Sequence, residues 1–442
     1  MLVPAAPASN AADKPNFVVI FCDDLGYGDL GCYGHPTIRT PQLDRMAAEG
    51  VRFTDFYSAA SVCTPSRAAL LTGRLPIRGG MQGQTRRVLF PDSERGLPAD
   101  EITLAEALVT AGYATACIGK WHLGHRHEYL PLRHGFEHYF GIPYSNDMRP
   151  NSRNPQSSRW PPLPLIRDDT TIETEPDQRL LTERYTDAAI TFIRQQKAEP
   201  DGRPFFLYLA HTMPHVPIFA SDRFAGKSAR GLYGDVVETI DWSTGEILRT
   251  LREMGLAENT LVLFTSDNGP WLLQRQAGGS AGLLREGKGS SWEGGMRVPC
   301  IAVWPGRIPR GVDRHAVAST LDIFPTALAL AGVPLPNDRA IDGQDLSPVL
   351  FGNGEVPERP FFYYRGGELM AVRRGPWKMH FKTQAGYAQP QPDVHDPPLL
   401  FHLGHDPGEQ YNVAKDHPEA IAELTRVAQE HQSGVKPVEP QY

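Results

Sequence analysis

Short, continuous apolar segments alternate with helical patterns along most of this chain, and this alternation limits the fold more than any other feature. Residues 17–22, FVVIFC, are typical of a strand that is buried on both faces. Further strands are expected at residues 51–57, 113–118, 205–210, 260–265 and 300–304. Helices are expected near residues 40–49, 65–72, 104–111, 179–197, 234–254 and 321–331. Such alternation predicts an α/β fold in which helices cover both faces of a mostly parallel sheet.

The pattern changes after about residue 350. Short extended segments are expected at residues 361–364, 369–372 and 377–381, followed by a helix near residues 418–432. We therefore expect a large α/β domain over residues 15–350 and a small α+β domain with an antiparallel sheet over residues 351–442. Residues 1–14 are expected to be disordered or the remnant of a leader. Residues 146–177, polar and rich in Pro and Arg, are expected to form a surface or substrate loop.

Composition excludes several classes of protein. The 442 residues include 44 Lys and Arg against 51 Asp and Glu, with no basic block, so nucleic-acid binding is not expected. No apolar segment approaches the roughly 18 residues of a membrane span. Five cysteines form an odd and sparse set, which excludes a disulfide framework. The N-terminal segment and the lack of an N-x-[ST] sequon favour a bacterial periplasmic or secreted protein.

Acidic and amide side chains directly follow two of the expected strands. Asp23 and Asp24 come after the first strand, and Asp267 and Asn268 come after the strand at residues 260–265. For the first pair alone, a turn with a capping aspartate is an equal alternative to a cation site. Because ligands of such sheets bind beyond the carboxyl ends of the strands, the four side chains are expected to lie together. Their oxygens suit Ca²⁺ or Mg²⁺ rather than Zn²⁺.

The segment C-T-P-S-R, residues 63–67, is the most informative part of the chain. Pro65 and the following apolar residues are typical of a helix that ends at Gly73. Cys63 is then expected just before the helix N-terminus, where free N–H groups favour an anion, and Arg67 would add a bidentate donor. A cysteine in such a place is more often a small buried hydrophobic residue, so the residues alone leave its role open.

Five motifs together resemble those of a known family. C-T-P-S-R followed by A-A-L-L-T-G-R is similar to the signature of the type I sulfatases. The other motifs follow in the family's order: D-D-L-G-Y-G-D-L-G at residues 23–31, G-K-W-H-L-G at 119–124, S-D-N-G-P at 266–270 and G-K-G-S-S-W-E-G-G at 287–295. The resemblance extends from about residue 15 to beyond residue 430, and is strongest to the arylsulfatase A and N-acetylgalactosamine-6-sulfatase branches. It implies an alkaline-phosphatase-like fold, with the catalytic domain at residues 15–350.

The resemblance implies a metal centre and a modified residue. It assigns Asp23, Asp24, Asp267 and Asn268 as ligands of a divalent cation, usually Ca²⁺, with Mg²⁺ as the alternative. It also assigns Cys63 as the residue that a formylglycine-generating or other sulfatase-maturing enzyme oxidises to Cα-formylglycine. In the family the formylglycine adds an oxygen to the metal shell, and its hydrate is the nucleophile.

Several basic residues also match the family's active site. By resemblance, Lys120 holds sulfate and the formylglycine, Lys288 contacts sulfate near the bridging oxygen, and Arg67 helps to stabilise the developing charge. His122 is implied to act on the formylglycine hydroxyl. Lys120 and His122 are two residues apart on a segment expected to be extended, so their side chains would point to the same side. Without the resemblance, a structural role for His122 would be the more common one.

The remaining site residues follow the strand at residues 205–210 and the segment G-I-P-Y-S-N-D. By resemblance, His215 binds sulfate and protonates the departing alcohol. His211 is a competing candidate in the sequence, and His215 is preferred because of the x-P pattern that follows it. Ser145 matches a polar residue that lines the sulfate pocket in the arylsulfatase A branch.

The resemblance implies hydrolysis of sulfate monoesters, including aryl sulfates, with a small sulfated sugar such as galactose- or N-acetylgalactosamine-6-sulfate as the natural substrate. Two alternatives are a phosphonate or phosphodiester hydrolase on the same fold, and a non-catalytic sulfated-glycan binder in which Cys63 stays a thiol. Arg86, Arg87, Arg149 and Arg153 either contact a sugar carboxylate or second sulfate, or are solvated surface charges. A homo-oligomer is compatible with the sequence.

Overall fold

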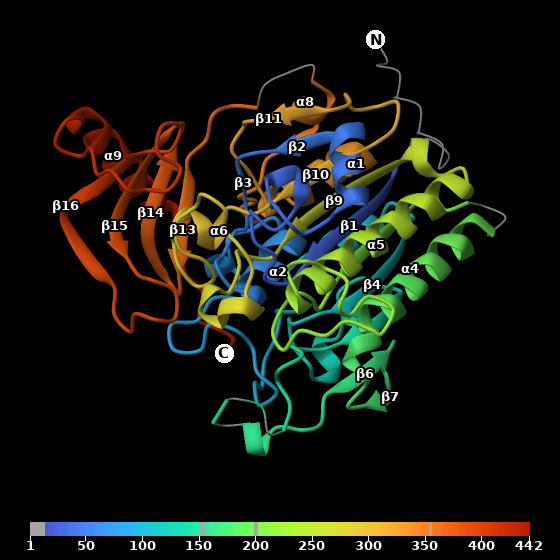
Figure 1. Ribbon diagram of the computed structural model, residues 1–442. Coiled ribbons are helices and arrows are strands. Elements are labelled where there is room, and N and C mark those ends of the chain that lie inside the picture. Colours follow the sequence, from blue (N-terminus) through green and yellow to red (C-terminus); the bar gives the residue numbers. More distant parts are fainter. Residues whose placement is uncertain (1–13, 151, 153, 156, 199–201, 353–355) are drawn as a thin grey trace, which may run out of the picture.

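A ten-stranded mixed sheet lies at the centre of the molecule (Figure 1). The computed structural model describes residues 14–442 except 151, 153, 156, 199–201 and 353–355, so the expectations for residues 1–13 and Arg153 lie outside the described residues. In spatial order the strands are β11 (Val312–Arg314), β2 (Val51–Phe53), β10 (Cys300–Val303), β9 (Thr260–Ser266), β1 (Asn16–Cys22), β8 (Phe205–Ala210), β4 (Ala114–Lys120), β5 (His138–Ile142), β6 (Pro164–Arg167) and β7 (Thr170–Thr174). Strands β9, β1, β8, β4 and β5 are mutually parallel, while β10, β6 and β7 pair antiparallel. The predicted mostly parallel, mixed sheet is therefore confirmed.

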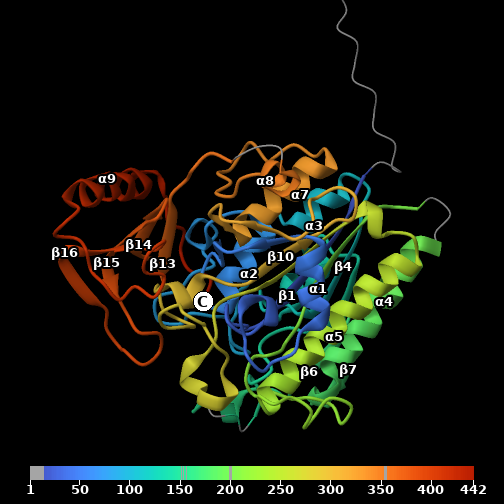
Figure 2. The same ribbon diagram turned by 45° about the horizontal axis from the view of Figure 1, so that its top comes forward.

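Helices cover both faces of this sheet (Figure 2). One layer holds α1 (Pro41–Glu49), α4 (Leu181–Ala198) and α5 (Leu232–Glu253); the other holds α2 (Cys63–Thr72), α3 (Leu104–Val109), α7 (Ile323–Ala331) and α8 (Ser347–Phe351). The reason is visible in β1, whose side chains alternate between the two layers: Val18 and Ile20 pack with the first, Phe17 and Val19 with the second. A strand that is buried on both faces needs the continuous apolar sequence seen here.

Proline and glycine residues mark the ends of α1 and α2. Thr40 is the residue before α1, Pro41 is its first residue, and Gly50 follows its end. The Thr40 hydroxyl makes no capping bond to the helix; it accepts from Gly31 N at 2.8 Å and donates to Asp44 at 2.9 Å. Gly73 ends α2 with φ of 66°, a left-handed conformation that glycine adopts without strain.

The C-terminal part forms a separate four-stranded antiparallel sheet, on the left in Figure 1. Its strands are β13 (Phe361–Arg365), β14 (Glu368–Arg374), β15 (Trp377–Thr383) and β16 (Asp393–His402), and α9 (Pro418–Gly434) packs on one face. Three strands and the helix were expected. The fourth strand, β16, was not predicted, because two prolines and two aspartates interrupt the alternation of apolar and polar residues that marks a strand. Prolines are tolerated in β16 because it lies at the edge of the sheet.

Two sequence expectations were wrong in detail. Residues 51–57 form two strands and not one. The chain leaves the main sheet at Asp55, because the Asp55 carboxylate pairs with Arg297 and Arg373. The second strand, β3 (Phe56–Tyr57), pairs with β12 (Ala318–Ser319) in a small separate sheet. The segment 146–177, expected as a loop, contains the β6–β7 hairpin that extends the main sheet. In the described part of the chain, no helix combines the length and the apolar character needed to span a membrane.

Candidate active site

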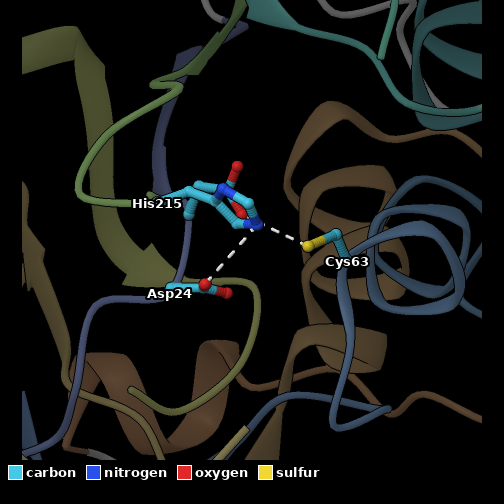
Figure 3. A group of neighbouring side chains, drawn as sticks. Asp24, Cys63 and His215 are labelled. Carbon is cyan, nitrogen blue, oxygen red and sulfur yellow. Dashed lines mark hydrogen bonds and ion pairs between the residues drawn. The ribbon is translucent and has the colours of Figure 1, made fainter. Parts of the chain in front are cut away.

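The predicted site residues meet at the carboxyl-terminal edge of the parallel strands. Asp23 and Asp24 follow β1, Asp267 and Asn268 follow β9, and Lys120 is the last residue of β4. Cys63, expected just before a helix, is instead the first residue of α2, with Val62 in the N-cap position. Figure 3 shows Asp24, Cys63 and His215 pointing at one another from three separate segments. The ligand-capable atoms of Asp23, Asp24, Cys63 and His215 all lie within 4.8 Å of one another.

Three buried carboxylates form the floor of the site. Asp24 N donates to Asp267 Oδ1 at 3.1 Å, and Asn268 Nδ2 donates to Asp24 Oδ1 at 2.7 Å. Asp24 has φ of 65°, a left-handed conformation that Asp adopts more readily than most residues, and it turns the chain directly after β1. The two strand ends are thereby joined through side chains that are more than 240 residues apart in the sequence.

Each carboxylate is paired with one buried cationic group. Lys120 Nζ binds Asp23, Lys288 Nζ lies 2.8 Å from Asp24, and Arg67 Nη2 lies 2.8 Å from Asp267 Oδ2. Burial would raise the pKa of Asp23, but Lys120 and the neighbouring cations outweigh it and hold that pKa well below its usual range. Burial and the charge of Asp23 raise the pKa of Asp267 to about 7. When Asp267 is also ionised, three carboxylates face three cationic groups, and the bare cluster is then close to neutral.

Cys63 lies between these two sets of charges. Its Sγ donates to Asp23 Oδ1 at 3.2 Å, and Lys288 Nζ lies 3.6 Å from the same sulfur. Burial, followed by the charges of Asp23 and Asp267, raises the pKa of the thiol well above its usual value. An unmodified Cys63 is therefore held as a protonated thiol, which is a poor nucleophile.

The two histidines of the site differ in which nitrogen is free. His122 Nε2 lies 2.9 Å from the carbonyl oxygen of Leu89, so this nitrogen carries the hydrogen, and Nδ1 is buried without a partner. His215 Nδ1 lies 2.6 Å from the carbonyl oxygen of Val216, so Nε2 faces Asp24 at 3.7 Å. Burial lowers the pKa of both rings well below the usual value. His122 thus presents an unprotonated ring nitrogen, as a base requires.

The competing histidine lies apart from this cluster. His211 Nε2 lies 3.4 Å from Ser243 Oγ, and burial lowers the pKa of His211 to about 4. The expected extended conformation at Lys120–His122 was wrong: Lys120 ends β4, but His122 has φ of 60°, so the chain turns between them. Ser145 lies beside the cluster: its Oγ accepts from Lys120 Nζ at 3.2 Å and lies 3.4 Å from His215 Nδ1.

The acidic residues fit a divalent cation. Asn268 Oδ1 is buried with no hydrogen-bond partner in the structure, and an acceptor in such a position costs stability unless something binds it. It adjoins the carboxylates of Asp23, Asp24 and Asp267, which together supply an all-oxygen set. Oxygen ligands of this kind suit Ca²⁺ or Mg²⁺.

A cavity of about 650 Å³ opens beside His215. Its lining includes Asp147, Arg149, Val216, Pro217, Ile218 and Trp271. The Trp271 ring centroid lies 5.6 Å from that of His215 and 4.6 Å from Lys288 Nζ, so the indole joins the cavity to the charged cluster. Trp271 was not among the predicted site residues, although its position directly after the S-D-N-G-P motif indicates that it lies close to the site.

The fold is of the alkaline-phosphatase-like class. Among solved structures, the PsFucS1 sulfatase from Pseudoalteromonas sp. superposes with a TM-score of 0.85 at 31% identity, covering 96% of this chain and 91% of that chain. The phosphonate monoester hydrolase SpPMH from Silicibacter pomeroyi superposes with a TM-score of 0.67 over 96% of each chain. At 19% identity this second likeness shows the fold alone.

Sequence comparisons place the chain within that class. A family model described as Sulfatase matches residues 15–333, and one described as the C-terminal region of aryl-sulfatase matches residues 356–442. N-acetylgalactosamine-6-sulfatase from Canis lupus familiaris is 44% identical, covering 98% of this chain and 89% of that protein. Arylsulfatase A from Homo sapiens is also 44% identical, over 97% and 89%. The chain belongs to the sulfatase family and is a sulfuric ester hydrolase.

Proposed function

We propose that the protein hydrolyses the sulfate monoester of a sulfated sugar, using a Cα-formylglycine made from Cys63 and a divalent cation, Ca²⁺ or Mg²⁺. One observation carries this proposal: Cys63 Sγ lies between the carboxylate of Asp23 and the ammonium group of Lys288 at the start of α2. A thiol makes only weak use of such surroundings, through its single S–H donor to Asp23, whereas a hydrated aldehyde there has acceptors and donors for both hydroxyls. The formylglycine would supply the nucleophilic oxygen that the buried thiol lacks.

The side chains around Cys63 have distinct parts in this proposal. Asp23, Asp24, Asp267 and Asn268 would hold the cation, which lowers the barrier by withdrawing charge from the sulfate oxygens. Nε2 of His215 would protonate the departing alcohol once the negative charge of a bound sulfate ester favours the doubly protonated ring, and the Lys288 ammonium group lies nearby.

The basic residues have complementary roles. Lys120 would hold sulfate and the residue at position 63. The positive charge of Arg67, which is also paired with Asp267, would help to stabilise the negative charge that develops on the sulfate oxygens. His122 Nδ1 would accept a proton from the formylglycine hydroxyl. Ser145, whose Oγ lies 3.4 Å from His215 Nδ1, would line the sulfate pocket.

The charge balance of the site supports an anionic substrate. The three carboxylates are matched by Arg67, Lys120 and Lys288. A bound dication would therefore leave a net positive site for sulfate, although the whole chain carries a charge of −7. The neighbouring cavity, with its apolar Val216–Ile218 wall and Trp271, would take the sugar.

The relatives and the sequence favour particular biological settings. Because a relative that is 44% identical is named N-acetylgalactosamine-6-sulfatase, we propose galactose- or N-acetylgalactosamine-6-sulfate as the natural substrate class. Use of a formylglycine requires a sulfatase-maturing enzyme as a partner during synthesis. We propose a periplasmic or secreted location, in keeping with the sequence expectation.

Parallel assays of an aryl sulfate and an aryl phosphodiester test the reaction class. We expect kcat/KM to be at least about a hundred-fold higher for the sulfate. A sulfate monoester offers three non-bridging oxygens to the three cationic groups and the dication, whereas a phosphodiester offers two and adds a second ester group that the site would have to accommodate. A higher value for the phosphodiester or a phosphonate monoester would instead support the alternative hydrolase. No turnover of either would favour the non-catalytic glycan binder.

Adding Ca²⁺ to protein stripped of divalent cations is expected to raise the thermal midpoint of unfolding. An ion that binds only the folded state stabilises it by about 2.7 kcal/mol at one hundred times its Kd. Differential scanning fluorimetry measures the shift. Asn268→Ala removes one ligand oxygen and should move the titration to higher calcium concentrations, whereas Asn259→Ala, which removes an amide bound to Lys14 O far from the site, should not. A midpoint that responds to neither Ca²⁺ nor Mg²⁺ would contradict the cation site.

A further inference from the structure

Two arginines lie beside the active site and take no part in the scheme above. The guanidinium of Arg87 stacks over the ring of Tyr387 at 4.3 Å, and its Nη2 donates to Gly289 O at 3.2 Å, one residue beyond Lys288. The Tyr387 ring lies 5.4 Å from that of Trp271, which in turn lies under the Lys288 ammonium group. Arg87 is thus connected to the catalytic lysine both along the chain and through two adjoining aromatic rings.

The second arginine comes from the C-terminal sheet. Arg365, the last residue of β13, donates from Nη2 to Gly386 O at 2.8 Å. Gly386 in turn lies directly beside Lys288, since a Cβ built on Gly386 would be 2.8 Å from Lys288 O. The hydrogen bond to Gly386 therefore brings the Arg365 side chain close to the Lys288 backbone. Arg87 binds the carbonyl of Gly289 and Arg365 binds the carbonyl of Gly386, and these two backbone segments touch at Lys288, so both guanidinium groups are held at the same place. In keeping with this geometry, burial and then the charge of Arg87 lower the pKa of Arg365 to about 10.

These two partly buried arginines differ from the fully buried cations of the site in having no carboxylate partner. Arg67, Lys120 and Lys288 each pair with an aspartate. In the described part of the chain, the hydrogen bonds of Arg87 and Arg365 go to backbone carbonyls, and no Asp or Glu forms an ion pair with either. Arg365 Nη1 is moreover buried and has no hydrogen-bond partner.

Two neighbouring guanidinium groups without a counter-ion are costly to the protein alone. A buried donor of a charged group that lacks an acceptor loses its hydration without compensation, and like charges add repulsion. A sulfate or carboxylate would remove both costs, because its oxygens accept paired N–H bonds from a guanidinium fork. The ring of Tyr387, 42% exposed, offers an apolar face for a sugar at the same place.

We propose that Arg87 and Arg365 form a subsite for a second anionic group of the substrate, a sulfate or a uronic acid carboxylate on the same or the adjacent sugar. This inference rests on the proposed function, because the sulfate that is cleaved must occupy the site at Cys63. The subsite would narrow the proposed substrate class from galactose-type 6-sulfates in general to those in which the same or the adjacent sugar carries a second negative group. The subsite would bind this second group without taking part in the cleavage.

Kinetics of matched substrates test the subsite. The substrates are an aryl sulfate with no other charge, a galactose carrying only the 6-sulfate, a galactose disulfate, and a disaccharide of a 6-sulfated sugar with a uronic acid. In the wild-type protein, kcat/KM should be higher for one or both doubly charged sugars than for the 6-monosulfate. Which of them is preferred distinguishes a second sulfate from a carboxylate.

Substitutions then locate the effect. Arg365→Gln and Arg87→Gln should each lower kcat/KM for the preferred doubly charged sugar about ten-fold or more, and change aryl sulfate turnover by less than about two-fold. Arg365→Lys, which keeps the charge without the fork, should retain part of the preference. Arg86→Gln is the matched control, since Arg86 is the neighbouring residue but already pairs with Asp92 at 2.7 Å.

The outcomes separate the two proposals. Equal kcat/KM for singly and doubly charged sugars in wild-type protein that turns over aryl sulfate would overturn the subsite and leave the proposed function intact. An equal loss of aryl sulfate and disulfate turnover in Arg365→Gln and Arg87→Gln would also overturn it, because the arginines would then be structural. Wild-type protein that cleaves no sulfate ester would overturn the proposed function itself.

Discussion

Replacing Cys63 with alanine is expected to lower turnover of an aryl sulfate by roughly a thousand-fold or more, which is typical for loss of a nucleophile. Cys63 is buried against Asp23 and Lys288, and in the proposed mechanism its replacement removes the side chain from which the nucleophilic oxygen is made. The loss should appear in kcat rather than in KM, because the groups that bind sulfate stay in place. Single-turnover and steady-state assays measure it.

A mass measurement shows whether the working residue is a thiol. Peptide mapping of active wild-type protein should find residue 63 as an aldehyde or its hydrate, and the fraction modified should scale with specific activity across preparations. Active protein in which residue 63 is entirely unmodified cysteine would sink the proposed use of a formylglycine. This readout does not depend on the choice of substrate.

A second cysteine provides the control. Cys32 is half-buried outside the cluster, and Cys32→Ala should leave turnover within about two-fold of the wild-type value. Comparable losses from Cys32→Ala and Cys63→Ala would mean that general damage to the fold, not loss of a reacting group, explains the result. Thermal unfolding of both variants shows directly whether the fold is intact.

The sequence predicted the central sheet well because the physical signal was strong there. Strands β1, β8 and β9 are buried on both faces, which forces the continuous apolar segments that were recognised. The signal failed where other forces decide the structure. The break at Asp55 depends on arginines about 240 and 320 residues away, and β16 is an edge strand that tolerates prolines. Such long-range pairing leaves no local pattern.

In the site, too, the features that follow from the sheet topology were predicted, and those that depend on local turns or on long-range packing were not. Asp23, Asp24, Asp267 and Asn268 were predicted to meet because strand ends at one edge of a parallel sheet meet by topology. The turn at His122 was not predicted, since a left-handed histidine has no reliable local signal. Arg365 was not singled out at all, because its position beside Lys288 results from how the C-terminal sheet packs on the segment before α6 (Glu293–Met296).

That packing depends on a buried lysine, and replacing Lys378 with methionine is expected to destabilise the protein by about 3–5 kcal/mol. Lys378 lies in β15 and is fully buried, with Nζ 2.9 Å from Glu293 Oε1 and 3.0 Å from Glu409 Oε1. It also donates to Ser291 O at 2.9 Å, in the segment between Lys288 and α6. Methionine has a similar volume but leaves two buried carboxylates without their shared cation.

A lysine on the same strand is the control for this change. Lys382 pairs with Glu368, but both side chains are partly exposed, so Lys382→Met should cost no more than about 1 kcal/mol. Urea unfolding at pH 7 gives both values. Equal stability of the two variants would contradict the view that the buried pairing of Lys378 fastens the C-terminal sheet to the segment that carries Lys288.

The pH dependence separates charge from packing in this result. Burial would raise the pKa of Glu293, but Lys378, Arg297 and Arg373 outweigh it and hold that pKa well below the usual range. A lowered folded-state pKa contributes stability above the unfolded-state pKa of about 4.3, and this contribution is lost as pH falls. Without Lys378 the folded-state pKa of Glu293 rises, so the deficit of Lys378→Met should be largest near pH 7 and shrink as the pH falls below that raised pKa. A deficit that stays constant down to the pH at which the wild-type protein itself unfolds would mean that lost packing, not an unpaired carboxylate, destabilises the variant.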